Sequence, residues 1–336
     1  MKDNLSRASL FNLIIYADAP HRLSYFREVV QTVIKKYPCR IILIQNQGNE
    51  QSDLFETEKT TVSSESESSG IVCDQITIKV SGPSVKKVPF QVLASLAPDL
   101  PIYLLWGQEP NKEHEILPHL QGVADHLIFD SECVDDLSSF SQVMLDKKGW
   151  HGRIIDMNWA RFSGWRDVLC HAFENQERID ELKDSVEVTI NYNSQPSASF
   201  KHQDTQAVYL QAWLAARLGW KYLSKTEEDS IKRYHFSQNS HELVISVEPV
   251  KVGSFAPGAI TSIKTAGSAG DTTTLIRNEN TPKQIAAQIC SAHSCESPFS
   301  IPLYTMTRGL TFIKQILYAP SSPQYYEMLQ ILSQQH

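Results

Sequence analysis

The stretch Asp-Met-Asn-Trp-Ala-Arg-Phe-Ser-Gly-Trp-Arg-Asp, residues 156–167, marks the point at which the residue pattern of this 336-residue chain changes. It follows a short apolar run at residues 153–155, which is typical of a buried strand, and it begins a segment with helical periodicity. Before it, short apolar runs alternate with helical segments, whereas after it strand-like runs follow one another. The change predicts two domains, residues 1–178 and 179–336.

The part before the stretch predicts a mostly parallel, Rossmann-like sheet with crossover helices. The predicted strands cover residues 11–16, 40–44, 71–80, 102–106, 126–129 and 153–155, and the predicted helices cover residues 23–37, 84–96, 113–120 and 135–145. Polar residues at 45–70 interrupt this pattern and predict a mobile surface loop, whose acidic part at 47–70 we interpret as a tolerated insertion.

The turn after the first predicted strand has no phosphate-binding loop. It consists of Ala17-Asp18-Ala19-Pro20-His21, with no glycine to let a pyrophosphate approach the backbone. A Gly-rich loop ending in Lys-Ser or Lys-Thr does not occur in the sequence either. We therefore predict a nucleotide-type fold without its nucleotide loop, and no cofactor.

The part after the stretch predicts an α+β domain with an antiparallel meander. The predicted strands cover residues 186–192, 231–236, 242–248, 258–264 and 272–277, and the predicted helices cover residues 205–218, 282–290, 307–317 and 324–332. Turn-forming residues at 238–240 and 267–271 separate consecutive strands, as in a meander.

The composition is that of a soluble globular protein, with 41% apolar and 21% charged residues. A net charge of -7 argues against a nucleic-acid partner, because phosphate neutralisation needs a basic face. No apolar run is long enough to cross a membrane, and residues 10–16 fit a buried strand better than a signal peptide. We therefore expect a cytoplasmic protein without a membrane partner.

Cys290 and Cys295 are close in sequence, whereas the other four cysteines are scattered. Together with His293 they could supply three zinc ligands, but a fourth ligand is missing nearby, so we predict no metal. A reversible disulfide between Cys290 and Cys295 is the favoured alternative, and two ordinary thiols are the simplest one.

Two segments rich in Trp and Arg are the candidate functional residues. In the first, four apolar residues recur at helical spacing and are expected to pack inward: Trp159, Phe162, Leu169 and Phe173. Arg161 and Trp165 lie four residues apart on another face, where a guanidinium can stack on an indole. The segment is either a packed inter-domain helix or a recognition helix for a protein partner.

The second segment is a predicted helix, Tyr209-Leu210-Gln211-Ala212-Trp213-Leu214-Ala215-Ala216-Arg217-Leu218-Gly219-Trp220, with apolar residues on two sides. Gly219 fits the C-terminal cap. Arg217 is the charged residue on this apolar helix, and we expect it to pair with an acid such as Asp156 or Asp167.

Both segments resemble the glucose-6-phosphate dehydrogenase assembly protein family, OpcA. The resemblance rests on Asp156-Met157-Asn158-Trp159-Ala160-Arg161 with Trp165-Arg166-Asp167, and on Trp213-Leu214-Ala215-Ala216-Arg217-Leu218-Gly219-Trp220. Further matching segments are Tyr37-Pro38-Cys39-Arg40, Cys73-Asp74-Gln75-Ile76 and Leu96-Ala97-Pro98-Asp99-Leu100-Pro101, which leads to Trp106. The resemblance covers most of the chain and weakens after about residue 225.

The resemblance implies a non-enzymatic factor that binds glucose-6-phosphate dehydrogenase and promotes its active oligomer. The contact candidates are the surface-exposed members of Trp159, Arg161, Trp165, Arg166, Trp213, Arg217 and Trp220. One alternative is an enzyme that acts on a phosphorylated sugar, held near Arg22, Arg40 or His21 in the α/β domain; another is a pure scaffold.

Overall fold

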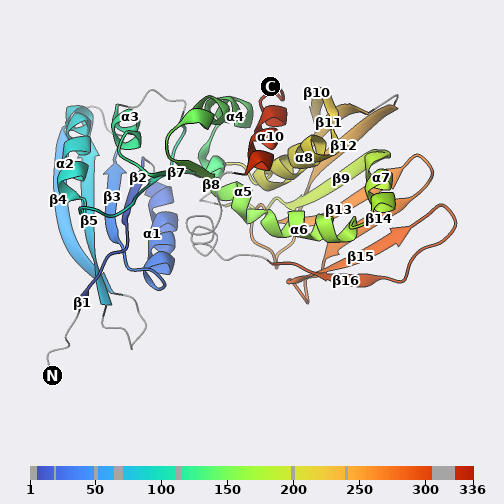
Figure 1. Ribbon diagram of the computed structural model, residues 1–336, viewed down its shortest axis with the longest axis horizontal. Helices are drawn as coiled ribbons and strands as arrows, with labels where there is room; N and C mark the ends of the chain where they lie inside the picture. Colours follow the sequence, from blue (N-terminus) through green and yellow to red (C-terminus); the bar gives the residue numbers. More distant parts are fainter. Residues whose placement is uncertain are drawn as a thin grey trace. The chain divides into compact units, whose positions relative to one another are not determined.

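A computed structural model describes residues 6–18, 20–48, 52–63, 71–110, 115–197, 201–238, 241–304 and 322–336. These residues form two compact units (Figure 1). Unit 1 contains the described residues up to Asp135 and Lys147–Met157, and unit 2 contains Asp136–Asp146, residues 158–304 and Ser322–His336. Among the described residues, no helix is both long and apolar enough to cross a membrane.

Unit 1 is built on a sheet that is parallel except for one edge strand. Its strands are β1 (Ser6–Arg7), β2 (Asn12–Ala17), β3 (Arg40–Asn46), β4 (Leu54–Ser63), β5 (Ile71–Ser81), β6 (Ile102–Trp106), β7 (His126–Phe129) and β8 (Arg153–Asp156). The order is β1-β5-β3-β2-β6-β7-β8, with β4 paired to β5. The mostly parallel sheet predicted from the sequence is therefore confirmed, and its strand order reverses between β2 and β6.

Helices of unit 1 pack on strands that are apolar on both faces. They are α1 (Pro20–Ile34), the 3-10 helix η1 (Gly82–Lys87), α2 (Val88–Ser95) and α3 (Ile116–Gln121), with short 3-10 turns η2 (Ser131–Cys133) and η3 (Lys147–Gly149). Phe26, Val29 and Val33 of α1 join Leu13 and Leu43 of the sheet in one buried cluster. This burial fixes α1 on one face of the sheet.

The predicted mobile loop at residues 45–70 contains strand β4 instead, which corrects the sequence prediction. β4 pairs antiparallel with β5 along its whole length of 10 residues. Most of its side chains are exposed, because it is an edge strand. Such a strand has the polar composition of a loop, so its hydrophobic pattern gives no signal. Residues 49–51 and 64–70 lie outside the described part of the chain.

Unit 2 is built on a mostly antiparallel sheet. Its strands are β9 (Ser185–Asn193), β10 (Lys221–Glu228), β11 (Ile231–Gln238), β12 (His241–Val250), β13 (Ile260–Gly267), β14 (Thr272–Arg277), β15 (Gln284–Cys290) and β16 (Phe299–Pro302). The order is β10-β11-β12-β9-β13-β14-β15-β16. β9 lies between β12 and β13 and runs parallel to β12, so the sheet is two meanders joined by β9 rather than one.

The predicted helix at residues 282–290 is wrong, because this segment forms strand β15. Ile285, Ala287 and Ile289 are buried, while the residues between them are exposed. This alternation has the period of two that a strand requires. The predicted helix at residues 307–317 lies outside the described residues.

Helices of unit 2 include both Trp-rich segments. They are α4 (Leu137–Asp146), α5 (Met157–Arg161), α6 (Ser163–Ala172), α7 (Gln176–Lys183), α8 (Thr205–Leu218) and α10 (Pro323–Leu332). Residues 158–178, which we predicted in the first domain, lie in this second unit because Trp159 packs on Tyr325 and Phe162 on Tyr209. Where the chain divides into independently folding domains stays a prediction.

Candidate functional site: the tryptophan segments and the two edges of the parallel sheet

Arg166 is held against aromatic rings in the first Trp-rich segment. Its guanidinium carbon lies 3.6 Å from the centroid of the Trp159 ring and 4.4 Å from that of the Phe162 ring. Its Nη1 donates a hydrogen bond to the Trp159 carbonyl oxygen at 2.7 Å. Burial lowers the pKa of Arg166 to about 10, and the Asp167 carboxylate acts in the opposite direction. The guanidinium therefore stays charged at neutral pH, and it binds two ring faces and one carbonyl.

The arginine on the Trp159 ring is thus Arg166, whereas we predicted that Arg161 would stack on Trp165. The helix is interrupted at Phe162, between α5 and α6. Residues four apart across such a break no longer share one helix face. Arg161 instead donates from Nη1 to Asn158 Oδ1 at 3.0 Å, and Trp165 is buried.

Close packing explains the glycine at position 164, at the start of α6. A Cβ atom at this position would lie 2.5 Å from the carbonyl oxygen of Tyr304. Contacts this short do not occur, so any larger residue would push α6 away from the chain that follows β16. The glycine serves close packing within unit 2.

The second segment, on α8, is also part of the interior of unit 2. Trp213 and Trp220 are 6% and 2% exposed. The indole nitrogen of Trp220 donates to the side-chain oxygen of Gln238 on β11. Gly219 caps α8 with a φ of 74°, as predicted from the sequence, because glycine adopts this left-handed conformation without strain.

Arg217 is exposed and pairs with an acid other than the two we predicted. Its Nη1 lies 3.4 Å from Oε2 of Glu327 on α10, and both side chains are 45% exposed. We expected Asp156 or Asp167, because a buried arginine needs a nearby carboxylate. The side chain lies at the surface of α8, so it reaches the neighbouring helix instead, and an exposed pair of this kind contributes little to stability.

The structure thus divides the seven predicted contact residues into two groups. The four tryptophans are buried: Trp159, Trp165, Trp213 and Trp220. The three arginines keep exposed surface: Arg161, Arg166 and Arg217. Since buried indoles cannot touch a partner without unfolding unit 2, the prediction of contact now concerns the arginines alone, and their role stays a prediction.

Cys290 and Cys295 are joined by a disulfide at the end of β15. The next residue, Glu296, accepts two hydrogen bonds from Arg178 of α7, at 2.9 and 2.8 Å. The disulfide occupies both sulfur atoms, so the structure contains neither the two free thiols nor a zinc site with His293. Whether this disulfide is reduced and reformed, as a redox pair, stays a prediction.

Side chains fill the carboxyl ends of the parallel strands in unit 1. Tyr16 of β2 stacks on Trp106 of β6, with ring centroids 4.2 Å apart, and both rings are buried. The Nδ2 of Asn46, at the end of β3, donates to the Tyr16 hydroxyl at 2.9 Å, while burial raises the pKa of that hydroxyl. Arg22 of α1 forms a buried ion pair with Asp130, which follows β7. The residues at these strand ends therefore engage one another.

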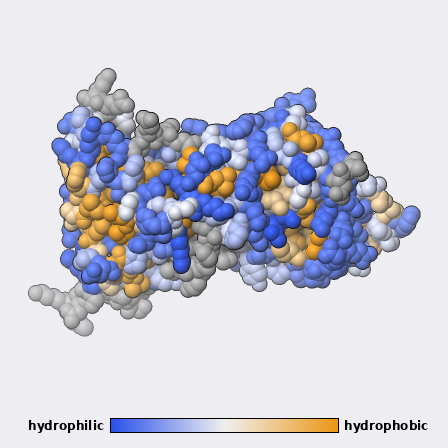
Figure 2. Space-filling model, turned by 45° about the horizontal axis from the view of Figure 1, so that its top comes forward, coloured by the Kyte–Doolittle hydropathy of each residue, from blue (hydrophilic) through white to orange (hydrophobic). Residues whose placement is uncertain are grey.

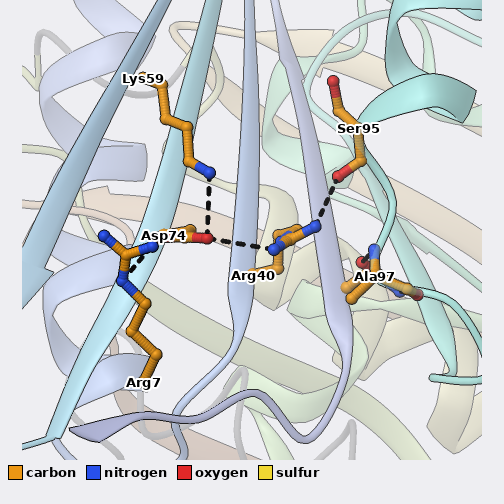
Figure 3. Close-up of polar contacts among 7 residues, drawn as sticks. Arg7, Arg40, Lys59, Asp74, Ser95 and Ala97 are labelled. Atoms are coloured by element: carbon orange, nitrogen blue, oxygen red, sulfur yellow. Dashed lines mark hydrogen bonds and ion pairs between the residues drawn. The ribbon is translucent and has the colours of Figure 1, made fainter.

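Three cations surround one carboxylate at the amino ends of the same strands (Figure 3). Asp74 Oδ2 accepts from Arg40 Nη2 at 3.0 Å and lies 3.4 Å from Lys59 Nζ, and Asp74 Oδ1 lies 3.8 Å from Arg7 Nε. The Asp74 side chain is 8% exposed, whereas those of Lys59 and Arg7 are 57% and 67% exposed. One carboxylate neutralises one of the three cations, and so this Asp74 cluster has a surplus of positive charge.

The Asp74 cluster joins three of the segments that carry the family resemblance. Arg40 closes Tyr37-Pro38-Cys39-Arg40, and Asp74 belongs to Cys73-Asp74-Gln75-Ile76. Arg40 Nη1 also donates to the Ser95 carbonyl oxygen at 3.2 Å, just before Leu96-Ala97-Pro98-Asp99-Leu100-Pro101. The three segments therefore meet at the amino ends of the parallel strands, where they form part of the structure of the sheet.

The enzymatic alternative requires a phosphate site, and the described residues that we proposed for it do not lie together. Arg22 follows β2 and lies at the carboxyl edge of the sheet, whereas Arg40 begins β3 and lies at the amino edge. Each is paired with an acid, Asp130 or Asp74. The side chain of His21 lies outside the described part of the structure.

Solved structures of oxidoreductases share this fold at low sequence identity. A 3-ketoreductase from Actinomadura kijaniata, in complex with NADP and TDP-benzene, is 9% identical; the match covers 96% of this chain and 94% of that one, with a TM-score of 0.52. A Desulfitobacterium hafniense protein described as an NADPH-dependent oxidoreductase is 7% identical over 97% and 94% of the two chains, with a TM-score of 0.55. At these identities the likeness shows the fold alone.

A dinucleotide does not fit the carboxyl edge of unit 1. In doubly wound sheets the dinucleotide lies where the strand order reverses, and here the two strands at that point end in the stacked rings of Tyr16 and Trp106. Asp18 after β2 places a carboxylate where a pyrophosphate needs donors. The first residue of α1 is Pro20, which has no backbone N–H to offer a phosphate.

Two family models match the chain in order. They are described as the N-terminal and C-terminal domains of a glucose-6-phosphate dehydrogenase subunit, and they match residues 30–144 and 153–294. A Synechococcus elongatus protein named OpcA is 26% identical over 229 residues, 66% of this chain and 49% of that protein. A Nostoc punctiforme protein of the same name is 25% identical over 231 residues, 67% of this chain and 48% of that protein. The chain spans about half the length of these curated relatives. It belongs to the OpcA family of glucose-6-phosphate dehydrogenase assembly proteins.

Proposed function

We propose that this chain binds glucose-6-phosphate dehydrogenase in the cytoplasm and promotes the active oligomer of that enzyme, in the oxidative pentose phosphate pathway. The observation that carries the proposal is the match of both halves of the chain to domains of a glucose-6-phosphate dehydrogenase subunit. The names of the cyanobacterial relatives, which refer to the OxPP cycle, support the pathway.

A non-enzymatic role agrees with the way unit 1 uses its polar and aromatic residues. At the point where the strand order reverses, the Tyr16 and Trp106 rings are buried and stacked on each other. Two buried charges that follow strands of this sheet, Arg22 and Asp130, neutralise each other. We therefore assign no catalytic residue and no cofactor, and the activity belongs to the partner enzyme.

The mechanism that we propose is a population shift. A protein that binds the active oligomer more tightly than the smaller species moves the equilibrium toward that oligomer. A preference of about tenfold corresponds to about 1.4 kcal/mol of coupling per bound copy, which is enough to change a mixed population. Chemistry at the partner's active site needs no residue of this chain.

Analytical ultracentrifugation and initial-rate kinetics together test the proposal. Glucose-6-phosphate dehydrogenase from the same organism is measured alone, with the full chain, and with an unrelated acidic protein at equal concentration. The proposal predicts that only the full chain shifts the enzyme to a larger species and changes its rate at subsaturating substrate. If neither the sedimentation nor the rate changes, the proposed function is wrong.

A further inference from the structure

The outer face of α2 in unit 1 is apolar and exposed. Phe90 is 75% exposed and Leu93 is 45% exposed, whereas Val88 and Val92 on the inner face are fully buried. Figure 2 shows hydrophobic side chains gathered over unit 1 at the left of the view, the end at which Figure 1 draws α2. Large apolar side chains exposed together are typical of a protein-binding surface.

The C-terminal end of α2 adjoins the Asp74 cluster, which is positively charged. Arg40 connects the two, because it donates both to the carbonyl oxygen of Ser95, the last residue of α2, and to Asp74. Lys59 and Arg7 hold most of the exposed charge there, since Asp74 is shared among three cations. The helix that carries the apolar face therefore ends against Arg40, which links it through Asp74 to two incompletely neutralised cations.

We propose that this outer face, Phe90 and Leu93 with Lys59 and Arg7 beside them, docks a protein partner whose surface has an apolar centre and carboxylates at one side. The apolar pair supplies burial, and the cations supply orientation through carboxylates of the partner. The inference rests on the proposed function in one respect: glucose-6-phosphate dehydrogenase is the protein that would present this surface.

A second copy of this chain is the wrong occupant for electrostatic reasons. In an antiparallel two-fold pairing of α2 with itself, the Asp74 cluster of one copy faces the N-terminal end of the other copy's helix. The carboxylates at that end are already engaged, because Glu115 pairs with Lys86 at 3.2 Å and Asp53 interacts with Lys87. Self-pairing therefore offers the Asp74 cluster no free carboxylate, whereas a partner with free carboxylates relieves the surplus charge.

Titration calorimetry of glucose-6-phosphate dehydrogenase with the full chain and three variants tests this surface. F90S/L93S removes the apolar centre, R7Q/K59Q removes the two cations, and L223S is the matched control, because Leu223 is 54% exposed on β10 of unit 2. We expect F90S/L93S to weaken binding about tenfold or more and L223S less than twofold. R7Q/K59Q should weaken binding at low salt and reduce its salt dependence. Equal melting temperatures show that the variants fold.

The outcomes separate this inference from the proposed function. If the unaltered chain does not bind the enzyme at any salt concentration, the proposed function fails. If it binds and F90S/L93S binds equally well, the function stands and the α2 surface is wrong. If the unaltered chain forms a dimer that F90S/L93S abolishes, a second copy is the occupant and the inference is overturned.

Discussion

Trp159 and Trp165 in unit 2 are 7% and 4% exposed, whereas Phe90 and Leu93 in unit 1 are 75% and 45% exposed. The tryptophans are covered because α8 and α10 supply Tyr209 and Tyr325 around their helix. The described residues place the sheet on one side of α2 and nothing comparable on the other. Whether a large apolar residue is available for contact therefore depends on the segments that pack against it. The number of such residues within its own segment does not decide this.

The largest expected effect comes from truncating the buried region. Trp159→Ala removes the ring that contacts Phe162, Tyr325 and Arg166, and a cavity of this kind costs about 3–5 kcal/mol. Phe90→Ala is the control and should change stability by about 0.5 kcal/mol or less, because it is exposed. Urea unfolding of both variants checks the contrast, and equal losses would remove the distinction between the two regions.

Arg166→Lys should cost less, about 1–2 kcal/mol, because lysine keeps the charge but loses the planar stack on Trp159 and part of the hydrogen bonding. Arg161→Lys is the matched control, since Arg161 donates a hydrogen bond to Asn158 within one helical turn. Thermal unfolding compares them. An Arg161→Lys variant that loses more stability than Arg166→Lys would show that we have assigned the stack to the wrong arginine.

A pH effect on stability is expected from one histidine of unit 1. His126 stacks on Tyr103 at 4.1 Å, and burial together with the nearby Arg153 lowers its pKa, while Asp125 opposes them. Below pH 6.5, its ordinary value, the unfolded chain binds a proton that the folded chain resists, so stability should fall as the pH falls from 6.5 toward the lowered pKa. Urea unfolding between pH 7 and pH 5 should show a shallower loss for His126→Gln.

The smallest effect is expected at the surface of unit 2. Arg217→Ala removes a half-exposed pair with Glu327, and such pairs are worth about 0.2–1 kcal/mol. The unfolding midpoint should move little, and adding salt should reduce the difference further. If Arg217→Ala lowers the unfolding midpoint as much as Trp159→Ala does, Arg217 belongs to the core of unit 2.

The sequence is informative wherever burial follows a regular period. Continuous apolar runs such as residues 11–16 and 102–106 predicted the parallel strands, because both faces of those strands are covered. It fails at β4, whose exposed edge has the composition of a loop. It also fails at β15, where the alternation of Ile285, Ala287 and Ile289 with exposed residues is too short to distinguish a strand from a helix.

The candidate site could be predicted only in part. The two Trp-rich segments identified the family and predicted an inward-facing set of residues, and Trp159 and Phe162 are indeed buried. The break at Phe162, which selects Arg166 for the stack, depends on packing that no local pattern encodes. The exposure of α2 was not predicted, because an apolar helix normally has covered faces and only the fold shows which face is left open.

Hydrogen exchange of the chain, measured alone and with glucose-6-phosphate dehydrogenase, tests the central claim most directly. That claim is that the chain binds the enzyme through the outer face of α2 and keeps the tryptophan segments as interior structure. We predict new protection over residues 84–97 of unit 1 that exceeds any change at residues 158–173 and 205–220, because the backbone of those two segments is already packed. New protection at residues 158–173 or 205–220, with none on α2, would contradict it.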